Sequence, residues 1–97
     1  MKLRFTRRAV DNITELADYI RARNPEAADA VRTAIYDSLT YLILFPNVGR
    51  LQTTEGVRNL VTRKYSYLIY YSVDEAAEEV VVLSVKHSAR ERDHSDL

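Results

Sequence analysis

The stretch Tyr65–Val73, which reads YSYLIYYSV, decides the fold of this chain. Its aromatic and aliphatic residues follow a period of two, the pattern of a β-strand whose side chains point alternately to the two faces of a sheet. Both faces are largely apolar, which predicts a strand in the centre of a sheet. One face would carry Tyr67, Ile69, Tyr71 and Val73, and the other Leu68, Tyr70 and Ser72.

Further strands are predicted around this stretch. Val57–Arg63 precedes it as one strand, and the acidic turn Asp74–Glu79 follows it. Val80–Lys86 forms the next strand, and its unbroken apolar run of four residues indicates that both of its faces are covered over part of its length. At the amino terminus, Lys2–Phe5 alternates basic and apolar side chains, which predicts a short strand with one buried face.

Two helices are predicted between the first strand and the others. Apolar side chains recur every three or four residues from Arg7 to Arg23, and again from Pro25 to about Leu44. Asn24 is placed to cap the second helix, whose first residue is a proline, a residue favoured at that position. The proline and glycine of Phe45–Arg50 end the helical pattern. Because the connection between the helices is so short, they must be antiparallel neighbours.

The predicted element order is therefore β-α-α-β-β-β, an α+β fold in which a helical hairpin packs on one face of a mostly antiparallel four-stranded sheet. The 97 residues predict a single domain, with a frayed polar tail at residues 93–97. The chain has no cysteine and two histidines, so we expect no disulfide, no metal and no other cofactor. No apolar run is long enough for a signal peptide or a membrane span, which predicts a cytoplasmic protein with no membrane partner.

Charge is balanced overall but unevenly distributed. The chain has 14 basic and 14 acidic residues. Basic residues concentrate in Met1–Arg8 and in Arg50–Lys64, whereas Asp74–Glu79 is acidic. If the two basic segments met in the fold, a neutral protein would present a cationic face to a polyanion or to an acidic protein.

The sequence carries no motif of a dehydrogenase, a kinase or a serine hydrolase. In an antiparallel meander, the arginines of the earlier strand could approach His87 and Arg90 at the end of the last strand. Cleavage of RNA by its own 2′-hydroxyl requires a proton acceptor, a proton donor and cations, which histidine and arginine can supply without a metal. The alternative is that Arg58 is a cross-strand charge partner and His87 a hydrogen-bonding residue at a strand end. The polar groups under consideration are Arg58, Arg63, Lys64, His87, Ser88 and Arg90.

Seven tyrosines also suggest a platform on which nucleic-acid bases stack. Three of them, however, lie near the apolar stripes of the predicted helices, and four lie in one strand, where aromatic residues pack well. This spacing favours a role in the core.

Six segments between about Phe5 and Arg92 carry a combined pattern: Ala9-x-Asp11 through Tyr19-Ile20, Asn24-Pro25-Glu26-Ala27-Ala28, Phe45-Pro46-x-x-Gly49-Arg50, Val57-Arg58-x-Leu60-Val61, Tyr65-x-Tyr67-x-Ile69-x-Tyr71 and Val85-x-His87-x-x-Arg90. Together they resemble the RelE/ParE toxin superfamily. The resemblance implies the same β-α-α-β-β-β sandwich, and a toxin of a type II toxin-antitoxin module of the kind linked to plasmid stabilisation. It also implies a small antitoxin protein that wraps the surface of the toxin.

The superfamily contains two activities. Toxins resembling RelE cleave messenger RNA on the ribosome, and usually carry an arginine in the central strand and an aromatic residue near the C-terminus. In this chain the matching strand position holds Leu68, and no aromatic residue follows Tyr71. Toxins resembling ParE poison DNA gyrase and are not nucleases, and the segments ending in Arg50 and in Arg90 look more like that branch.

The resemblance therefore favours a gyrase poison that is not an enzyme. The alternative is a metal-independent endoribonuclease that cuts messenger RNA on the ribosome, with Arg58, His87 and Arg90 in its site. A third possibility is an inert relic that still binds antitoxin.

The surface predicted to bind the target or the antitoxin is basic. Antitoxin segments that fold on binding are often acidic and amphipathic, and basic side chains beside apolar groups would suit them. The residues predicted for this surface are Arg50, Arg58, Arg63, Lys64, Lys86, His87 and Arg90.

Overall fold

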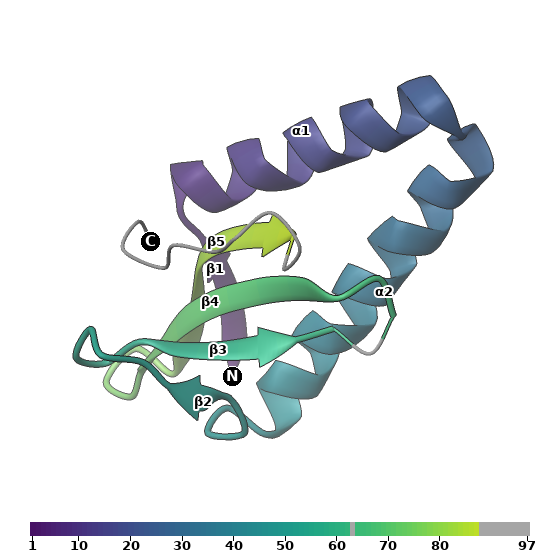
Figure 1. The fold of residues 1–97 in the computed structure, drawn as a ribbon. Coiled ribbons are helices and arrows are strands. Elements are labelled where there is room, and N and C mark those ends of the chain that lie inside the picture. Colours follow the sequence, from purple (N-terminus) through teal and green to yellow (C-terminus); the bar gives the residue numbers. More distant parts are fainter. Residues whose placement is uncertain (63, 88–97) are drawn as a thin grey trace.

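The computed structural model describes residues 1–62 and 64–87, which form two helices and a five-stranded sheet (Figure 1). The sheet order is β1-β5-β4-β3-β2, with β1 and β5 parallel and the other neighbours antiparallel. The predicted tail at residues 93–97 lies outside the described residues. In chain order the elements are β1 (Lys2–Phe5), α1 (Arg7–Arg23), α2 (Pro25–Leu44), β2 (Arg50–Leu51), β3 (Arg58–Val61), β4 (Tyr67–Asp74) and β5 (Glu79–His87).

The predicted fold class is confirmed, but the predicted count of four strands is one short. The additional strand, β2, has only two residues, which is too few for a period-two pattern to be visible in the sequence. It lies at the edge of the sheet, where Arg50 pairs with Asn59 and Leu51 with Arg58. The predicted strand over residues 57–63 is correspondingly shorter, because β3 covers Arg58–Val61 alone.

Both helices have the predicted bounds, and side-chain caps explain where they begin. The Thr6 hydroxyl accepts a hydrogen bond from the amide of Ala9 (3.1 Å), which starts α1. The Asn24 side-chain oxygen accepts one from the amide of Ala27 (3.3 Å), which starts α2 with a proline at its first position. Asn24 also ends α1, since its amide donates to the carbonyl of Ile20 (2.7 Å), so a single residue connects the two helices in the hairpin that covers one face of the sheet (Figure 1).

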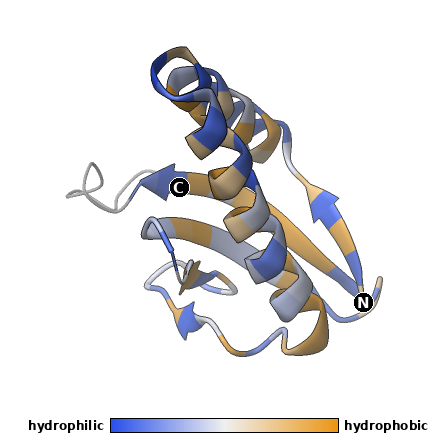
Figure 2. Ribbon diagram, turned by 90° about the vertical axis from the view of Figure 1, so that its right-hand side faces the viewer, coloured by the Kyte–Doolittle hydropathy of each residue, from blue (hydrophilic) through white to orange (hydrophobic). Residues whose placement is uncertain are grey.

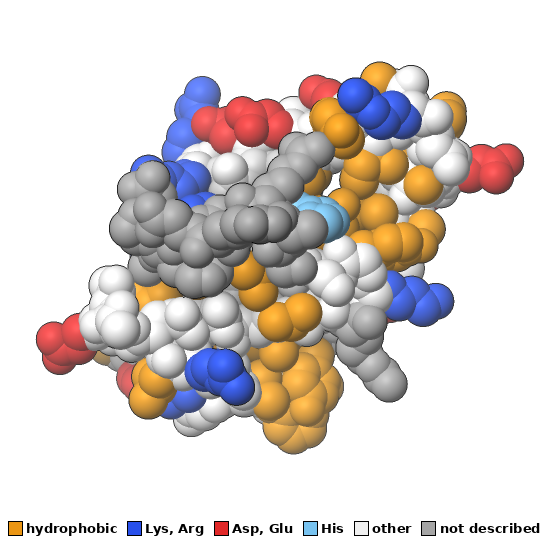
Figure 3. Space-filling model, viewed as in Figure 1, with side chains coloured by type: hydrophobic (Ala, Val, Ile, Leu, Met, Phe, Trp, Pro, Cys, Tyr) orange, Lys and Arg blue, Asp and Glu red, His pale blue; other side chains and the backbone are white. Residues whose placement is uncertain are grey.

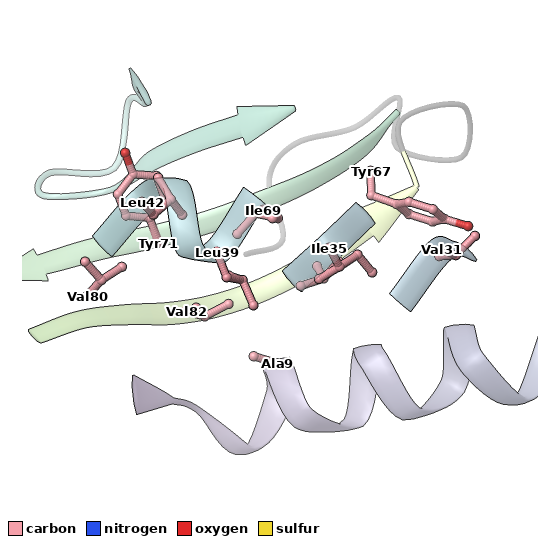
Figure 4. Packing of buried hydrophobic residues seen from close by; sticks show 11 residues of the cluster. Ala9, Val31, Ile35, Leu39, Leu42, Tyr67, Ile69, Tyr71, Val80 and Val82 are labelled. Carbon is pink, nitrogen blue, oxygen red and sulfur yellow. The ribbon is translucent and has the colours of Figure 1, made fainter. Parts of the chain in front are cut away.

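The main hydrophobic core lies between this hairpin and the sheet. Figure 2 shows long hydrophobic stretches on the strands behind the helices, and Figure 4 shows side chains of α2 among those of the sheet, with Ala9 on α1. The predicted faces of the central strand are confirmed: Tyr67, Ile69 and Tyr71 are buried in the main core, with Val73 packed against it. On the opposite face, Val57, Leu68 and Tyr70 form a second buried cluster.

A β-bulge in β5 changes which of its residues face the core. Tyr71 pairs with Val82 whereas Tyr70 pairs with Ser84, so Leu83 is an extra residue in the ladder. The Thr6 hydroxyl, which caps α1, also donates a hydrogen bond to the carbonyl of Leu83 (2.8 Å). This one side chain therefore joins the start of α1 to the bulge in the last strand.

Candidate functional site

His87 ends β5 at the same end of the sheet at which β4 begins. It pairs with Tyr67, and the two rings meet edge to face, with centroids 5.1 Å apart. Lys86 pairs with Leu68 and therefore belongs to the opposite face, where its ammonium lies 5.9 Å from the centre of the Tyr70 ring. The two adjacent residues thus serve different faces of the sheet, as the alternation of a strand requires.

A hollow of about 350 Å³ lies between α1 and the end of β5. It exists because β1 pairs with β5 only as far as Val82, so the helix takes over as the neighbour of the strand. Asn12 on α1 accepts a hydrogen bond from the amide of Val85 (3.0 Å). Val85 lies beyond the last residue of β5 that pairs with β1, so the Asn12 side chain gives this amide a hydrogen-bond partner. The hollow is lined by Asn12, Glu15, Leu16, Tyr19, Val85, Lys86 and His87.

Arg58 lies in a different place and makes different contacts. It pairs with Tyr71, and its guanidinium donates hydrogen bonds to the carbonyls of Asn47 (3.1 Å) and Gly49 (2.8 Å). The Tyr71 hydroxyl donates to the carbonyl of Pro46 (2.8 Å) and accepts from the amide of Gly49 (2.8 Å). These two side chains hold the turn that connects α2 to β2, and we call the contacts among residues 46–49, Arg58 and Tyr71 the turn network.

Two details show how closely the turn network is packed. A β-carbon added to Gly49 would lie 2.8 Å from the carbonyl oxygen of Asn59 and would overlap the Tyr71 ring, so only glycine fits there. Burial raises the pKa of the Tyr71 hydroxyl, while the hydrogen bond from Gly49 and the positive charge of Arg58 partly offset that rise. Tyr71 is therefore a neutral hydrogen-bonding group at ordinary pH.

The prediction that Arg58 approaches His87 is wrong. The partner of Arg58 in β4 is Tyr71 and the partner of His87 is Tyr67, four residues away along that strand. This spacing corresponds to about 13 Å along the strand and about 10 Å across two strand intervals. A pairing register cannot be read from the periodicity of single strands, because each strand alternates in the same way in every even register.

The two basic segments also do not meet. Lys2–Phe5 forms β1 at one edge of the sheet and Arg50–Leu51 forms β2 at the other, with three strands between them. The acidic turn is instead the neighbour of the first segment, because Arg4 forms an ion pair with Glu79 (3.3 Å). These two segments therefore do not form the continuous cationic face that we expected if they met.

The remaining predicted site residues are distributed over the fold. Arg50 is exposed on β2, and Lys64 is exposed in the turn before β4, at the end of the sheet that also holds His87. Arg63 and Arg90 lie outside the described residues. Among the described residues, no three histidine, aspartate or glutamate side chains come together as a metal-binding group, and neither helix is long and apolar enough to cross a membrane.

A family profile described as the ParE toxin of the type II toxin-antitoxin system, parDE, matches residues 3–92. The chain belongs to the ParE toxin family. A curated relative agrees with this result: Y4kP of Sinorhizobium fredii, which is named as a provisional toxin, is 30% identical over 87 residues, covering 90% of this chain and 88% of the relative.

Solved structures share the fold of this ParE-family chain. A chain of the chromosomal ParDE toxin-antitoxin system from P. aeruginosa superposes with a TM-score of 0.76 at 22% identity, covering 90% of this chain and 95% of that one. The isolated E. coli RelE toxin superposes with a TM-score of 0.71 at 21% identity, covering 96% of this chain and 87% of that one. At these identities the likeness shows the fold alone, which the ParE and RelE branches share.

Sequence reasoning about this ParE-family chain missed the hydrogen-bonding role of Tyr71 and the contribution of α1 to the hollow. Tyr71 lies among the residues predicted for the central strand, so the sequence indicated that its ring is buried. The sequence did not indicate what its hydroxyl group binds. A buried tyrosine hydroxyl normally has a polar partner, so the turn containing Pro46 and Gly49 was a candidate for that partner. Asn12 and Glu15 gave no comparable signal, because polar residues on an amphipathic helix usually face water.

Proposed function

We propose that this chain is the toxin of a type II toxin-antitoxin pair, that it poisons DNA gyrase, and that a cognate antitoxin protein neutralises it. One observation carries the choice of target: the central-strand position at which RelE-like nucleases usually have an arginine holds Leu68. This side chain is only 7% exposed and packs with Val57 and Tyr70 in the second cluster. A leucine in an apolar cluster cannot stabilise the charge of a pentavalent phosphate.

The position of Arg58 also supports a binding poison. Its guanidinium already donates to two carbonyls of the turn network, which lies away from His87. A nuclease site that used both residues would require them on one phosphate. The ParE family membership of the chain favours the same branch.

The test compares the two targets directly. Purified toxin is incubated with gyrase and supercoiled DNA, and separately with ribosomes translating a defined message. We expect cleaved DNA trapped with gyrase and an intact message. Cuts at defined codon positions, without any trapped DNA, would contradict the proposal. Toxin expression from an inducible promoter without a growth defect would instead indicate an inert relic.

The alternative function is a metal-independent, ribosome-dependent endoribonuclease. One feature favours it: His87 lies at the hollow beside α1, where Glu15 and Tyr19 also contribute to the lining. Such groups can accept and donate protons at a bound nucleotide. In that case substitution of His87 or Arg90 should abolish message cleavage, whereas substitution of Arg58 should act through the stability of the turn.

For the antitoxin, we propose a segment that follows the basic side chains around the end of β5. This end of the sheet carries Lys64, Lys86 and His87. The hollow beside α1 is lined in part by the apolar side chains of Leu16 and Val85. An acidic, amphipathic segment would pair with the cations and bury its apolar side chains. Charge reversal of Lys64 and Lys86 together should weaken antitoxin binding at least tenfold, measured by calorimetry with the neighbouring antitoxin. An unchanged affinity would exclude this end of the sheet.

A further inference from the structure

The C-terminal end of α2 and the segment after it expose large apolar side chains. The exposed fractions are 45% for Tyr41, 68% for Leu44, 53% for Phe45, 43% for Val48 and 63% for Leu51. We call these five residues the α2-exit surface. Figure 3 shows hydrophobic side chains gathered over this end of α2. Single exposed apolar residues need no explanation. Five of them within eleven positions, however, are typical of a surface that another molecule covers.

The α2-exit surface is held in a defined shape. The rings of Tyr41 and Phe45 pack with their centroids 5.0 Å apart, and the amide of Val48 donates to the carbonyl of Phe45 (3.1 Å). Beneath it, the turn network fixes the backbone that leads to Leu51. A phenylalanine in place of Tyr71 would fill the core equally well, so the hydroxyl serves the geometry of the turn. Exposed apolar groups that are already ordered lose less entropy when they bind a partner.

The charge of this region indicates the kind of partner. Between residues 38 and 54 the sequence contains no aspartate or glutamate, and its single charged residue is Arg50. Aromatic residues and arginine with few other charges are the composition of the buried centre of a protein interface. A second copy of the chain, related by a two-fold axis, would present the same segment, in which residues 38–54 contain no carboxylate to pair with Arg50. A different protein that carries a carboxylate would pair with it.

We propose that the α2-exit surface, together with Arg50, docks into an apolar cleft with an acidic rim on the folded protein that the toxin poisons. This inference rests on the proposed function, because it assumes a protein target. The surface shares no residue with the hollow of about 350 Å³ beside β5, nor with a second hollow of about 260 Å³ between α1 and α2. Both hollows suit an antitoxin segment. Toxin neutralised by antitoxin and toxin bound to its target therefore use different parts of the molecule.

The experiment combines charge substitutions with three measurements. The variants are the double substitution Leu44→Glu with Leu51→Glu, and the single substitutions Arg50→Glu and Arg50→Ala. Val10→Glu is the matched control, because Val10 on α1 is 46% exposed and lies outside this surface. Each variant is measured for growth arrest on induction, for trapping of gyrase on DNA, and for affinity to the antitoxin, with Tm as the check on folding.

We expect the double variant and Arg50→Glu to lose at least tenfold in growth arrest and in gyrase trapping, with Arg50→Ala in between, because added negative charge meets an acidic rim. Antitoxin affinity and Tm should stay at the values of Val10→Glu. Full toxicity of the double variant and of Arg50→Glu would overturn the inference, and so would a parallel loss of antitoxin affinity. If the double variant fails to fold, Arg50→Glu on the exposed edge strand decides the matter.

The same measurements distinguish the two proposals. If the wild-type toxin arrests growth without trapping gyrase, the proposed target is wrong, and the loss of growth arrest in the variants still tests the docking surface. If the wild type traps gyrase and the variants trap it equally well, only the docking surface is wrong. A wild-type chain that arrests no growth overturns both. Sedimentation that shows a dimer in the wild type and a monomer in the double variant would assign the surface to a second copy and overturn the inference.

Discussion

The two ends of the sheet differ in how they use their polar side chains. At the end with the α2–β2 turn, Arg58 and Tyr71 donate to backbone carbonyls and leave only glycine-sized space beside them. At the other end, His87 lines a hollow of about 350 Å³ between β5 and α1. Residues that look equally functional in the sequence thus divide into those that fix the backbone and those that border open space.

The largest effect is expected from filling the turn network. Gly49→Val should lower the free energy of unfolding by about 3 kcal/mol, because the added carbons meet the carbonyl of Asn59 and the Tyr71 ring. Urea denaturation measures this change. Gly56→Ala is the control, since its β-carbon would meet nothing within 4 Å and only the positive φ of 77° opposes it. That control should lose about 1 kcal/mol; equal losses for the two variants would contradict the close packing at Gly49.

The next effect tests the hydroxyl alone. Tyr71→Phe should lower the free energy of unfolding by about 2 kcal/mol, because the buried amide of Gly49 and the carbonyl of Pro46 both lose their partner. Thermal or urea unfolding gives the difference. Tyr36→Phe, at a residue that is 59% exposed, is the matched control and should change stability by less than about 0.5 kcal/mol.

A smaller effect separates the two ends of the sheet directly. Arg58→Ala should lower the free energy of unfolding by about 1 kcal/mol, because two carbonyls of the turn network lose a charged donor. His87→Ala should lower it by about half as much, through the loss of its edge-to-face contact with Tyr67. Circular dichroism during urea unfolding compares the two variants. A larger loss for His87→Ala would reverse the distinction between the two ends.

The smallest effect appears at high pH and concerns Tyr71. Its pKa in the folded protein is raised above the ordinary value of 10.0, mainly by burial. The folded state therefore keeps a proton that the unfolded state loses, so this contribution is complete below about pH 10 and falls as the pH rises toward the folded pKa. Unfolding measured from about pH 9 to about pH 11 should show a steeper loss in wild type than in Tyr71→Phe. Equal slopes would contradict a raised pKa.

Much of the fold was predictable because it follows from local periodicity. Both helices begin at caps that are visible in the sequence, and the alternation from Tyr67 to Val73 assigns the two faces of β4 correctly. The two-residue strand β2 and the bulge at Leu83 were not predictable, because neither produces a pattern of its own. The parallel pairing of β1 with β5 depends on contacts between the two ends of the chain, which no local window contains.

The candidate site was less predictable for a related reason. Residue types indicated that Arg58 and His87 were polar groups on strands, but only the register places them at different ends of the sheet. Arg50 was included for its charge, whereas apolar neighbours such as Leu44 and Phe45 gave no signal, since residue type alone does not separate an exposed apolar side chain from a buried one. The solvent exposure of Leu44 and Phe45, which cannot be read from the sequence, distinguishes them from core residues.

The link between Thr6 and Leu83 spans 77 positions, and the strand beside Thr6 pairs only with the last strand described. During synthesis the first strand has no partner until β5 has left the ribosome. A chain interrupted before β5 therefore cannot complete its sheet, and it lacks the core residues Val80, Val82 and Val85 that β5 supplies.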